Sequence, residues 1–124
     1  MITTFLNRFI VKLKSGTLMA YNSYELTEQG FYLLDGWMKL PMDKVDSITL
    51  VNVEILQQYV GEHPHVVAVT FTYEGTSYVA STRGNYVRQG ERWVKILVMP
   101  KTAAMRQLLH DIYTNALDFV YQEQ

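Results

Sequence analysis

The stretch RWVKILVMPKTAAMRQLLHDIYTNALDFVY, residues 92–121, joins a predicted strand to a predicted helix and decides the fold class. Apolar residues take every second position from Val94 to Val98, which is the period of a strand. Pro100 ends that strand, and Thr102 is placed to cap a helix. From Ala103 to Tyr121 the apolar residues recur at steps of three and four: Met105, Leu108, Leu109, Ile112, Ala116, Phe119 and Val120. We therefore expect a last strand over 92–99 and then a long amphipathic helix.

Upstream of this stretch, short turn sequences separate runs rich in aromatic and β-branched residues. Ser15-Gly16, Asp35-Gly36 and Glu74-Gly75 are two-residue loops typical of β-hairpins. The predicted strands are residues 8–14, 17–25, 31–34, 37–40, 48–53, 66–73 and 76–82. Residues 54–60 fit either a helical face or an extension of the preceding strand. Residues 83–91 hold two glycines and little apolar character, so we expect a loop there.

The order of these elements predicts an α+β protein. Strands that come in a run and are followed by a single helix favour antiparallel pairing over βαβ units. We expect one domain of 124 residues, with a β-rich roll over 1–99 and the helix over 100–124. The roll is expected to be a curled antiparallel sheet of about seven strands, in part barrel-like. One helix cannot cover both faces of such a sheet, so the sheet curls or a second subunit buries the other face.

Residues 8–52 resemble the core of a small SH3-like or Sm-like β-barrel. The run FIVKLKSGTLMAYNSYELTEQGFYLLDGWMKLPMDKVDSITLV carries the likeness: a strand ending in Lys-Ser-Gly-Thr, an antiparallel meander, and MDKVDSITL closing it. Many members of such families bind RNA, DNA or peptides, often as oligomers. The chain lacks the paired motifs of the Sm type and has its helix at the opposite end, so the resemblance implies a fold and assigns no functional residue.

Charge is distributed unevenly along the chain, although the net charge is only −1. From Glu25 to Glu62 there are seven acidic residues and two basic ones, whereas from Arg83 to Arg106 there are six basic residues and one acid. Such asymmetry bears on partners more than on fold. The second half of the chain is therefore the expected binding surface.

The segment STRGNYVRQGERWVK, residues 81–95, combines cations with aromatic rings. Cations neutralise phosphates or carboxylates, and flat side chains stack on bases or fill pockets of a partner. The predicted contact residues are Arg83, Tyr86, Arg88, Arg92, Trp93 and Lys95. The alternative interpretation is a solvated loop whose arginines pair with the acidic half. Arg8, Lys12 and Lys14 share one strand face and extend this surface if the first and last strands are neighbours; otherwise they protect an edge strand.

Motifs for catalysis are absent from the sequence. It has no nucleophile elbow, phosphate-binding glycine loop, zinc-protease motif or dinucleotide fingerprint. His63-Pro64-His65 offers two imidazoles without a third metal ligand that the spacing demands. We therefore predict no catalytic residue, no metal site, no cofactor and no enzymatic activity. The chain has no cysteine, which fits a reducing compartment, and no apolar run long enough to span a bilayer, so the expected location is the cytoplasm.

The predicted helix carries more apolar surface than a single sheet needs. Tyr113, Leu117 and Tyr121 widen its stripe, which favours a homo-oligomer, in particular a helix-mediated dimer. The sequence thus predicts a binding, adaptor or regulatory protein that contacts an acidic protein surface, a phosphate ligand or a nucleic acid. Two alternatives stay open: a small-molecule binder or enzyme with a pocket between sheet and helix, and a structural self-assembling subunit.

Overall fold

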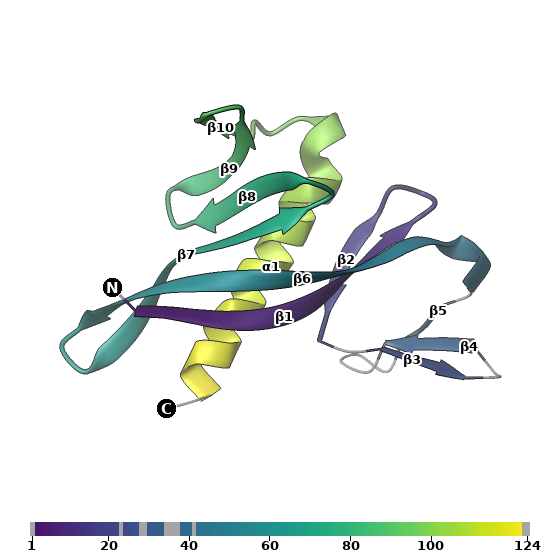
Figure 1. The fold of residues 1–124 in the computed structure, drawn as a ribbon, viewed down its shortest axis with the longest axis horizontal. Helices are drawn as coiled ribbons and strands as arrows, with labels where there is room; N and C mark the ends of the chain where they lie inside the picture. The colour runs from purple at the N-terminus through teal and green to yellow at the C-terminus, as the bar shows by residue number, and fades with distance from the viewer. Residues whose placement is uncertain (1, 23, 28–29, 34–37, 41, 123–124) are drawn as a thin grey trace.

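A seven-stranded antiparallel sheet with one long helix across one of its faces forms most of the molecule (Figure 1). The computed structural model describes the backbone of residues 2–22, 24–27, 30–33, 38–40 and 42–122, and the side chains of residues 2–22 and 43–122. The order of strands in the sheet is β10-β9-β8-β7-β6-β1-β2. Their bounds are β1 Ile2–Leu13, β2 Leu18–Tyr21, β6 Val45–Val60, β7 His63–Tyr73, β8 Thr76–Ser81, β9 Gly84–Gln89 and β10 Arg92–Lys95. The predicted α+β class with a curled antiparallel sheet is confirmed.

The remaining strands form a separate three-stranded sheet in the order β3-β4-β5. It consists of β3 Tyr24–Thr27, β4 Gly30–Leu33 and β5 Met38–Leu40, and the 3₁₀ turn η1 Met42–Lys44 leads from it into β6. The predicted hairpin turn Asp35-Gly36 lies outside the described residues. Residues 8–52 therefore contribute to two sheets, and the larger sheet stays open, with β10 and β2 as its edges.

The longest strands are β1 and β6, which pair from Ile2 with Gln57 to Leu13 with Val45. The segment that the sequence left ambiguous, residues 54–60, extends β6 and pairs with β7. The hairpin loops predicted at Ser15-Gly16 and Glu74-Gly75 join β1 to β2 and β7 to β8. Gly75 has a φ of +79°, which is the left-handed backbone that such a loop requires.

The expected loop over 83–91 is wrong, because residues 84–89 form strand β9 between β8 and β10. The two glycines that suggested a loop stand at the ends of this strand. Gly84 and Gly90 have φ values of +136° and +64°, so they turn the chain on either side of it. The segment is a strand because it pairs with β8 on one side and β10 on the other. Local composition gives no information about such pairing.

The last strand is shorter than expected: β10 ends at Lys95, not at residue 99. The amide of Ile96 still donates to the carbonyl of Asn85. Beyond it, the Thr102 hydroxyl bonds to the Leu97 carbonyl at 2.6 Å and accepts from the Met99 amide at 3.2 Å. The side chain expected to cap the helix therefore fastens the linker between strand and helix. The 3₁₀ turn η2 Pro100–Thr102 completes that linker.

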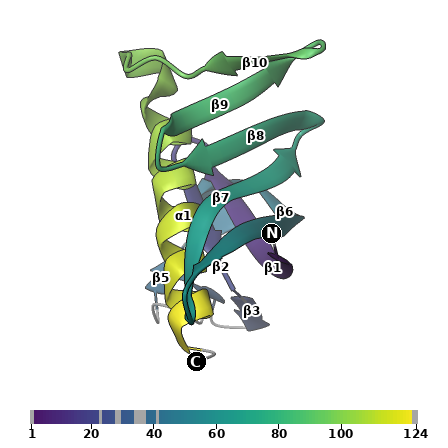
Figure 2. The same ribbon diagram turned by 90° about the vertical axis from the view of Figure 1, so that its left-hand side faces the viewer.

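Helix α1 Ala103–Gln122 confirms the predicted C-terminal helix and crosses the sheet on one face (Figure 2). Its residues Leu108, Leu109 and Ile112 are at most 1% exposed and pack against apolar side chains of the sheet. The sheet contributes mainly Ile10, Val51, Val53, Ile55, Val69, Phe71 and Ala80 to this core. We call the side of the sheet that faces α1 the helix face, and the other side the outer face.

The side of β1 that carries Arg8 and Ile10, which its charged residues suggested to be the solvent side, faces the helix. Ile10 lies in the core under α1. Arg8 is 3% exposed, and its guanidinium donates to the Ala20 carbonyl at 3.0 Å and to the Asn22 side chain. Arg8 therefore cannot extend a surface patch, and β6, β7, β8 and β9 separate β1 from β10. Val11, on the outer face, belongs to a second, smaller cluster with Met19 and Ile48.

Candidate binding face on the β9–β10 hairpin

The β9–β10 hairpin brings four of the six predicted contact residues to one face. Trp93 lies opposite Arg88, and Lys95 lies opposite Tyr86. Side chains directly opposite each other in an antiparallel pair project to the same face, as do those two residues apart along a strand. Tyr86, Arg88, Trp93 and Lys95 therefore share one face of the hairpin, which we call the basic-aromatic face.

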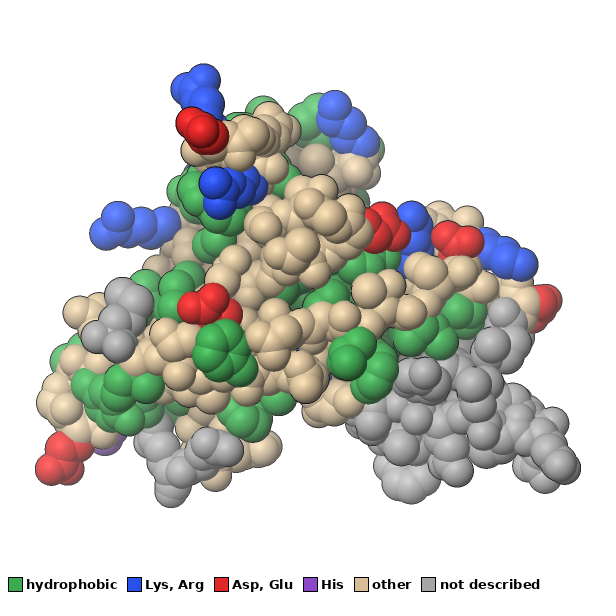
Figure 3. All heavy atoms as spheres, viewed as in Figure 1, with side chains coloured by type: hydrophobic (Ala, Val, Ile, Leu, Met, Phe, Trp, Pro, Cys, Tyr) green, Lys and Arg blue, Asp and Glu red, His purple; other side chains and the backbone are tan. Residues whose placement is uncertain are grey.

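This face belongs to the outer side of the sheet. Tyr86 pairs with Val79 of β8. The neighbours of Val79 on β8 point the other way: Ala80 is in the core, and the ring of Tyr78 stacks on Phe71 with 5.7 Å between centroids. The basic-aromatic face therefore lies on the side of the sheet that α1 does not cover, whereas the helix face forms the main core. Lys and Arg side chains project from the β8–β10 end of the molecule (Figure 3).

The other two predicted contact residues lie apart from this face. Arg92 pairs with Gln89, so it projects to the opposite side of the hairpin from Arg88. Arg83 sits in the turn between β8 and β9, where its amide donates to the Ser81 hydroxyl at 3.2 Å. The sequence does not tell which arginines share a face, because side-chain direction follows from strand pairing and the segment was expected to be a loop.

Contacts within the hairpin hold the two cations in place. The Arg88 guanidinium carbon lies 5.9 Å from the centre of the Trp93 ring, and its Nε donates to the Gly90 carbonyl at 3.1 Å. This is cation–π geometry between neighbours on opposite strands. The Lys95 side chain runs over Gly84, where an added Cβ would lie 3.1 Å from Lys95 Cε. Gly84 therefore leaves the space through which Lys95 reaches across β9.

The face also has an apolar hollow. Val79, Tyr86 and Trp93 line a depression of about 250 Å³. Trp93 is 46% exposed, which is unusual for so large an apolar side chain in a folded domain. A concave aromatic surface beside two cations suits a partner that offers both an anionic group and an apolar or flat group.

No acidic side chain neutralises these cations within the described part of the chain. Arg83, Arg88, Arg92 and Lys95 form no ion pair with any residue whose side chain the structure describes, whereas Lys12 lies 3.7 Å from Glu74. The alternative interpretation required these arginines to pair with the acidic half. Among residues 43–62 of that half, which the structure does describe, none pairs with them.

The residues proposed for an oligomer interface lie toward the C-terminal half of α1. The Tyr113 hydroxyl donates to the Val66 carbonyl at 3.1 Å, and Tyr113 and Leu117 both pack against the chain's own core. Tyr121 is 52% exposed. Of the three, Tyr121 offers the most surface to a second molecule, and helix-mediated dimerisation stays a prediction.

Among the described residues, no three His, Asp or Glu side chains lie close enough together to hold a metal ion. The helix in the described chain is not long and apolar enough to cross a membrane. Comparison with known proteins gives no match to a family model, a curated protein or a solved structure.

Sequence reasoning missed one polar residue on the helix face. Gln57 is 6% exposed and continues the inward series of Val51, Val53 and Ile55 on β6. The signal was a glutamine in step with three buried aliphatic residues, but it lay in the segment whose secondary structure was ambiguous.

Proposed function

We propose that this chain is a non-catalytic binding protein, an adaptor or regulator, that contacts an acidic partner through the basic-aromatic face. One observation carries the proposal: Tyr86, Arg88, Trp93 and Lys95 converge on one exposed face of a hairpin while their charges remain unpaired by described residues. Unpaired cations attract an acidic surface and steer its approach. Aromatic and arginine side chains supply most of the binding energy at many protein interfaces.

The opposed arginines of the hairpin allow a matched test. Arg88→Glu and Arg92→Glu make the same change in charge four residues apart, on opposite faces of the same hairpin. The probes are poly-L-glutamate and a single-stranded oligothymidylate, measured by isothermal titration calorimetry. We expect Arg88→Glu to weaken binding at least about tenfold and Arg92→Glu to weaken it about twofold.

Salt separates the two kinds of acidic partner. Binding to the oligothymidylate through phosphates falls steeply with salt, because each neutralised phosphate releases counterions. A protein-like partner gives a weaker dependence and a strong loss on Trp93→Ala. Equal losses in the two arginine variants, or no binding of either probe by the unaltered protein, would remove the basic-aromatic face as the site.

The natural partner can be sought directly by native mass spectrometry of the protein purified from its own host. A co-purifying oligonucleotide, phosphate ligand or acidic chain gives the class of partner. We expect it to be lost from the Arg88→Glu variant and retained by Arg92→Glu. The cysteine-free sequence makes the cytoplasm the proposed location.

Self-association through α1 is the second candidate, and the exposure of Tyr121 favours it. Leu117→Glu should dissociate a helix-mediated dimer, but Leu117 also packs against the core, so Tyr121→Glu is the cleaner variant. Sedimentation velocity should show a dimer for the unaltered chain and a monomer for Tyr121→Glu. A dimer that survives both changes would exclude this part of the helix as the interface.

A further inference from the structure

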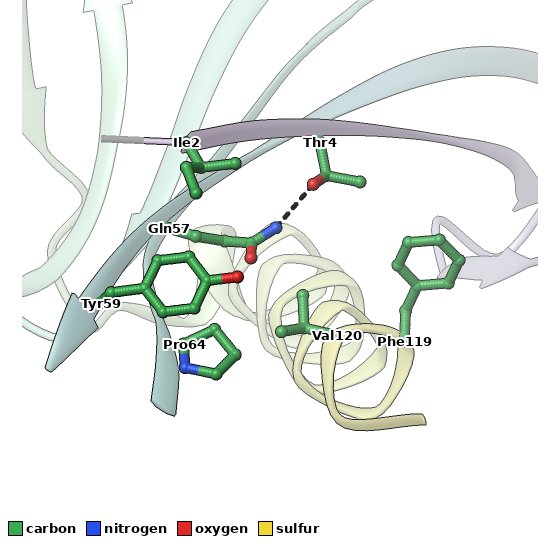
Figure 4. A pocket seen from close by; sticks show the side chains of 7 residues that line it. All are labelled: Ile2, Thr4, Gln57, Tyr59, Pro64, Phe119 and Val120. Carbon is green, nitrogen blue, oxygen red and sulfur yellow. Dashed lines mark hydrogen bonds between the residues drawn. The ribbon is translucent and has the colours of Figure 1, made fainter. Parts of the chain in front are cut away.

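A cavity of about 190 Å³ lies between the sheet and the last turns of α1, on the helix face and so on the other side of the sheet from the basic-aromatic face (Figure 4). Strands β1, β6 and β7 and the end of the helix each contribute to its wall. It is lined by Ile2, Thr4, Gln57, Tyr59, Pro64, Phe119 and Val120. None of these seven side chains is charged at neutral pH, so the cavity is suited to a neutral molecule.

A register shift in the sheet shapes this cavity. Between Leu56 and Gln57 the pairing of β6 with β7 shifts by one residue, which is a β-bulge. Because of the shift, Val66 and Pro64 join Val69 on the helix face, although they differ from it in parity. Pro64 pairs with Tyr59 at the end of the hairpin, and both side chains line the cavity.

Gln57 is a buried polar side chain in the wall of the cavity. Its side chain is among the few polar ones buried in this chain, at 6% exposure. Its Nε2 donates to the Thr4 hydroxyl at 2.6 Å. The carboxamide oxygen points into the space between Tyr59 and Val120, and the Tyr59 hydroxyl is directed to the same space (Figure 4). Neither Oε1 of Gln57 nor the Tyr59 hydroxyl forms a hydrogen bond with a described residue.

The orientation of the Gln57 carboxamide favours a ligand that carries a hydrogen-bond donor. The carboxamide oxygen has no donor among the described residues and is reached by water through the cavity, so a ligand N–H or O–H can take the place of that water. Thr4 fixes the amide nitrogen, which in turn fixes the direction of the oxygen. Ile2, Val120 and Phe119 supply apolar surface for the rest of the ligand.

We propose that this cavity binds a small neutral molecule with a flat apolar body and one N–H or O–H donor, which hydrogen-bonds to Oε1 of Gln57. Its volume exceeds the roughly 150 Å³ of engineered protein cavities that hold benzene. A fused two-ring compound is thus the upper size. This site is independent of the basic-aromatic face.

The test compares two probes of the same shape. Indole carries an N–H donor, and benzofuran replaces it with an oxygen that only accepts. Both are titrated into the ¹⁵N,¹³C-labelled full chain and followed by NMR. We expect saturable indole binding with a Kd below about 1 mM, shifts centred on the Gln57 amide and the Val120 methyls, and benzofuran at least about fivefold weaker.

Two glutamine variants provide the control. Gln57→Leu removes the acceptor, so it should abolish the preference for indole over benzofuran. Gln58→Leu makes the same chemical change at the next residue, which is exposed, and should keep the preference. Should Gln57→Leu not fold, the indole–benzofuran comparison on the unaltered chain still decides.

Three results would overturn the proposal. They are equal affinity of the unaltered chain for both probes, shifts spread over residues away from the cavity, and an unsaturated response at millimolar indole, which would indicate a cavity that holds water alone. If Arg88→Glu had no effect on binding of the acidic probes, the proposed function would be wrong, but the proposal for the cavity would be unaffected. The two proposals are therefore tested independently.

Discussion

The two faces of the large sheet differ in how much apolar surface they bury. On the helix face, Ile55 and Leu108 are completely buried. On the outer face, Phe5, Leu50 and Trp93 are 58%, 56% and 46% exposed. Burial of apolar area is the main favourable term in folding, so most of the stability comes from the helix face, with a smaller part from the Val11 cluster on the outer face. Beyond the Val11 cluster, the outer face keeps exposed apolar and cationic side chains, and the proposed function assigns some of them to a partner.

The largest expected effect contrasts the two faces directly. Ile112→Ala removes a side chain that is 1% exposed at the centre of α1, and it should lower the free energy of unfolding by about 3 kcal/mol. Leu50→Ala on the outer face should lower it by less than about 0.5 kcal/mol. Urea unfolding followed by circular dichroism measures both. Comparable losses would mean that the outer face is covered in solution, as in a dimer.

On the outer face, position 84 requires glycine for two reasons. Its φ of +136° is strained for any residue with a Cβ, and that Cβ would meet Lys95 Cε at 3.1 Å. Gly84→Ala should cost about 2 kcal/mol of stability by the same urea assay. Gly90→Ala, at a φ of +64° with open space around it, should cost about 1 kcal/mol.

A second substitution separates backbone strain from crowding. In a Lys95→Ala background the neighbour that crowds position 84 is gone, while the φ is unchanged. Gly84→Ala should then cost a few tenths of a kcal/mol less than in the unaltered chain. An undiminished cost would show that Lys95 does not cross β9 as the structure has it.

The sequence predicted those elements that depend on interactions between residues close together in the chain. The helix follows from apolar residues at steps of three and four, and the hairpin at Glu74-Gly75 follows from a two-residue loop between alternating runs. Strand β9 was missed, because its flanking glycines and charges resemble a loop and its pairing partners lie on both sides.

The candidate site was predicted as a set of residues but not as a surface. The sequence identified Arg88 and Arg92 together, whereas the strand pairing places them on opposite faces. A shift of one residue in a strand exchanges its faces, so side-chain direction depends on register. Register depends on contacts distant in the sequence, which is also why the inward direction of Gln57 and the burial of Arg8 were not predicted.

Alkaline pH probes the helix face through its tyrosines. Burial, with a smaller contribution from Tyr121, raises the pKa of the Tyr113 phenol above its ordinary value of 10.0. Burial likewise raises the pKa of Tyr73 and Tyr78. The unfolded chain therefore releases these protons at lower pH than the folded one. Stability is retained below about pH 10 and is lost as the pH rises further.

Tyr113→Phe isolates one of these groups. It removes the hydrogen bond to the Val66 carbonyl, so it should cost about 1 kcal/mol near pH 8. Its free energy of unfolding should then fall less steeply than that of the unaltered chain between about pH 9 and pH 11. Parallel curves for the two proteins would show that Tyr113 ionises freely in the folded state.

A small effect on stability is expected for the Arg88–Trp93 pair on the outer face, together with a larger effect on binding. Arg88 lies over the Trp93 ring on an exposed surface, where a cation–π contact contributes about 0.5 kcal/mol. A double-mutant cycle of Arg88→Ala and Trp93→Phe, measured by urea unfolding, should return a coupling of that size. The same Arg88→Ala change should weaken binding of the acidic probe severalfold. A coupling well above 1 kcal/mol would assign the pair to holding the hairpin together, and the case for a recognition surface would then rest on Lys95 and Tyr86.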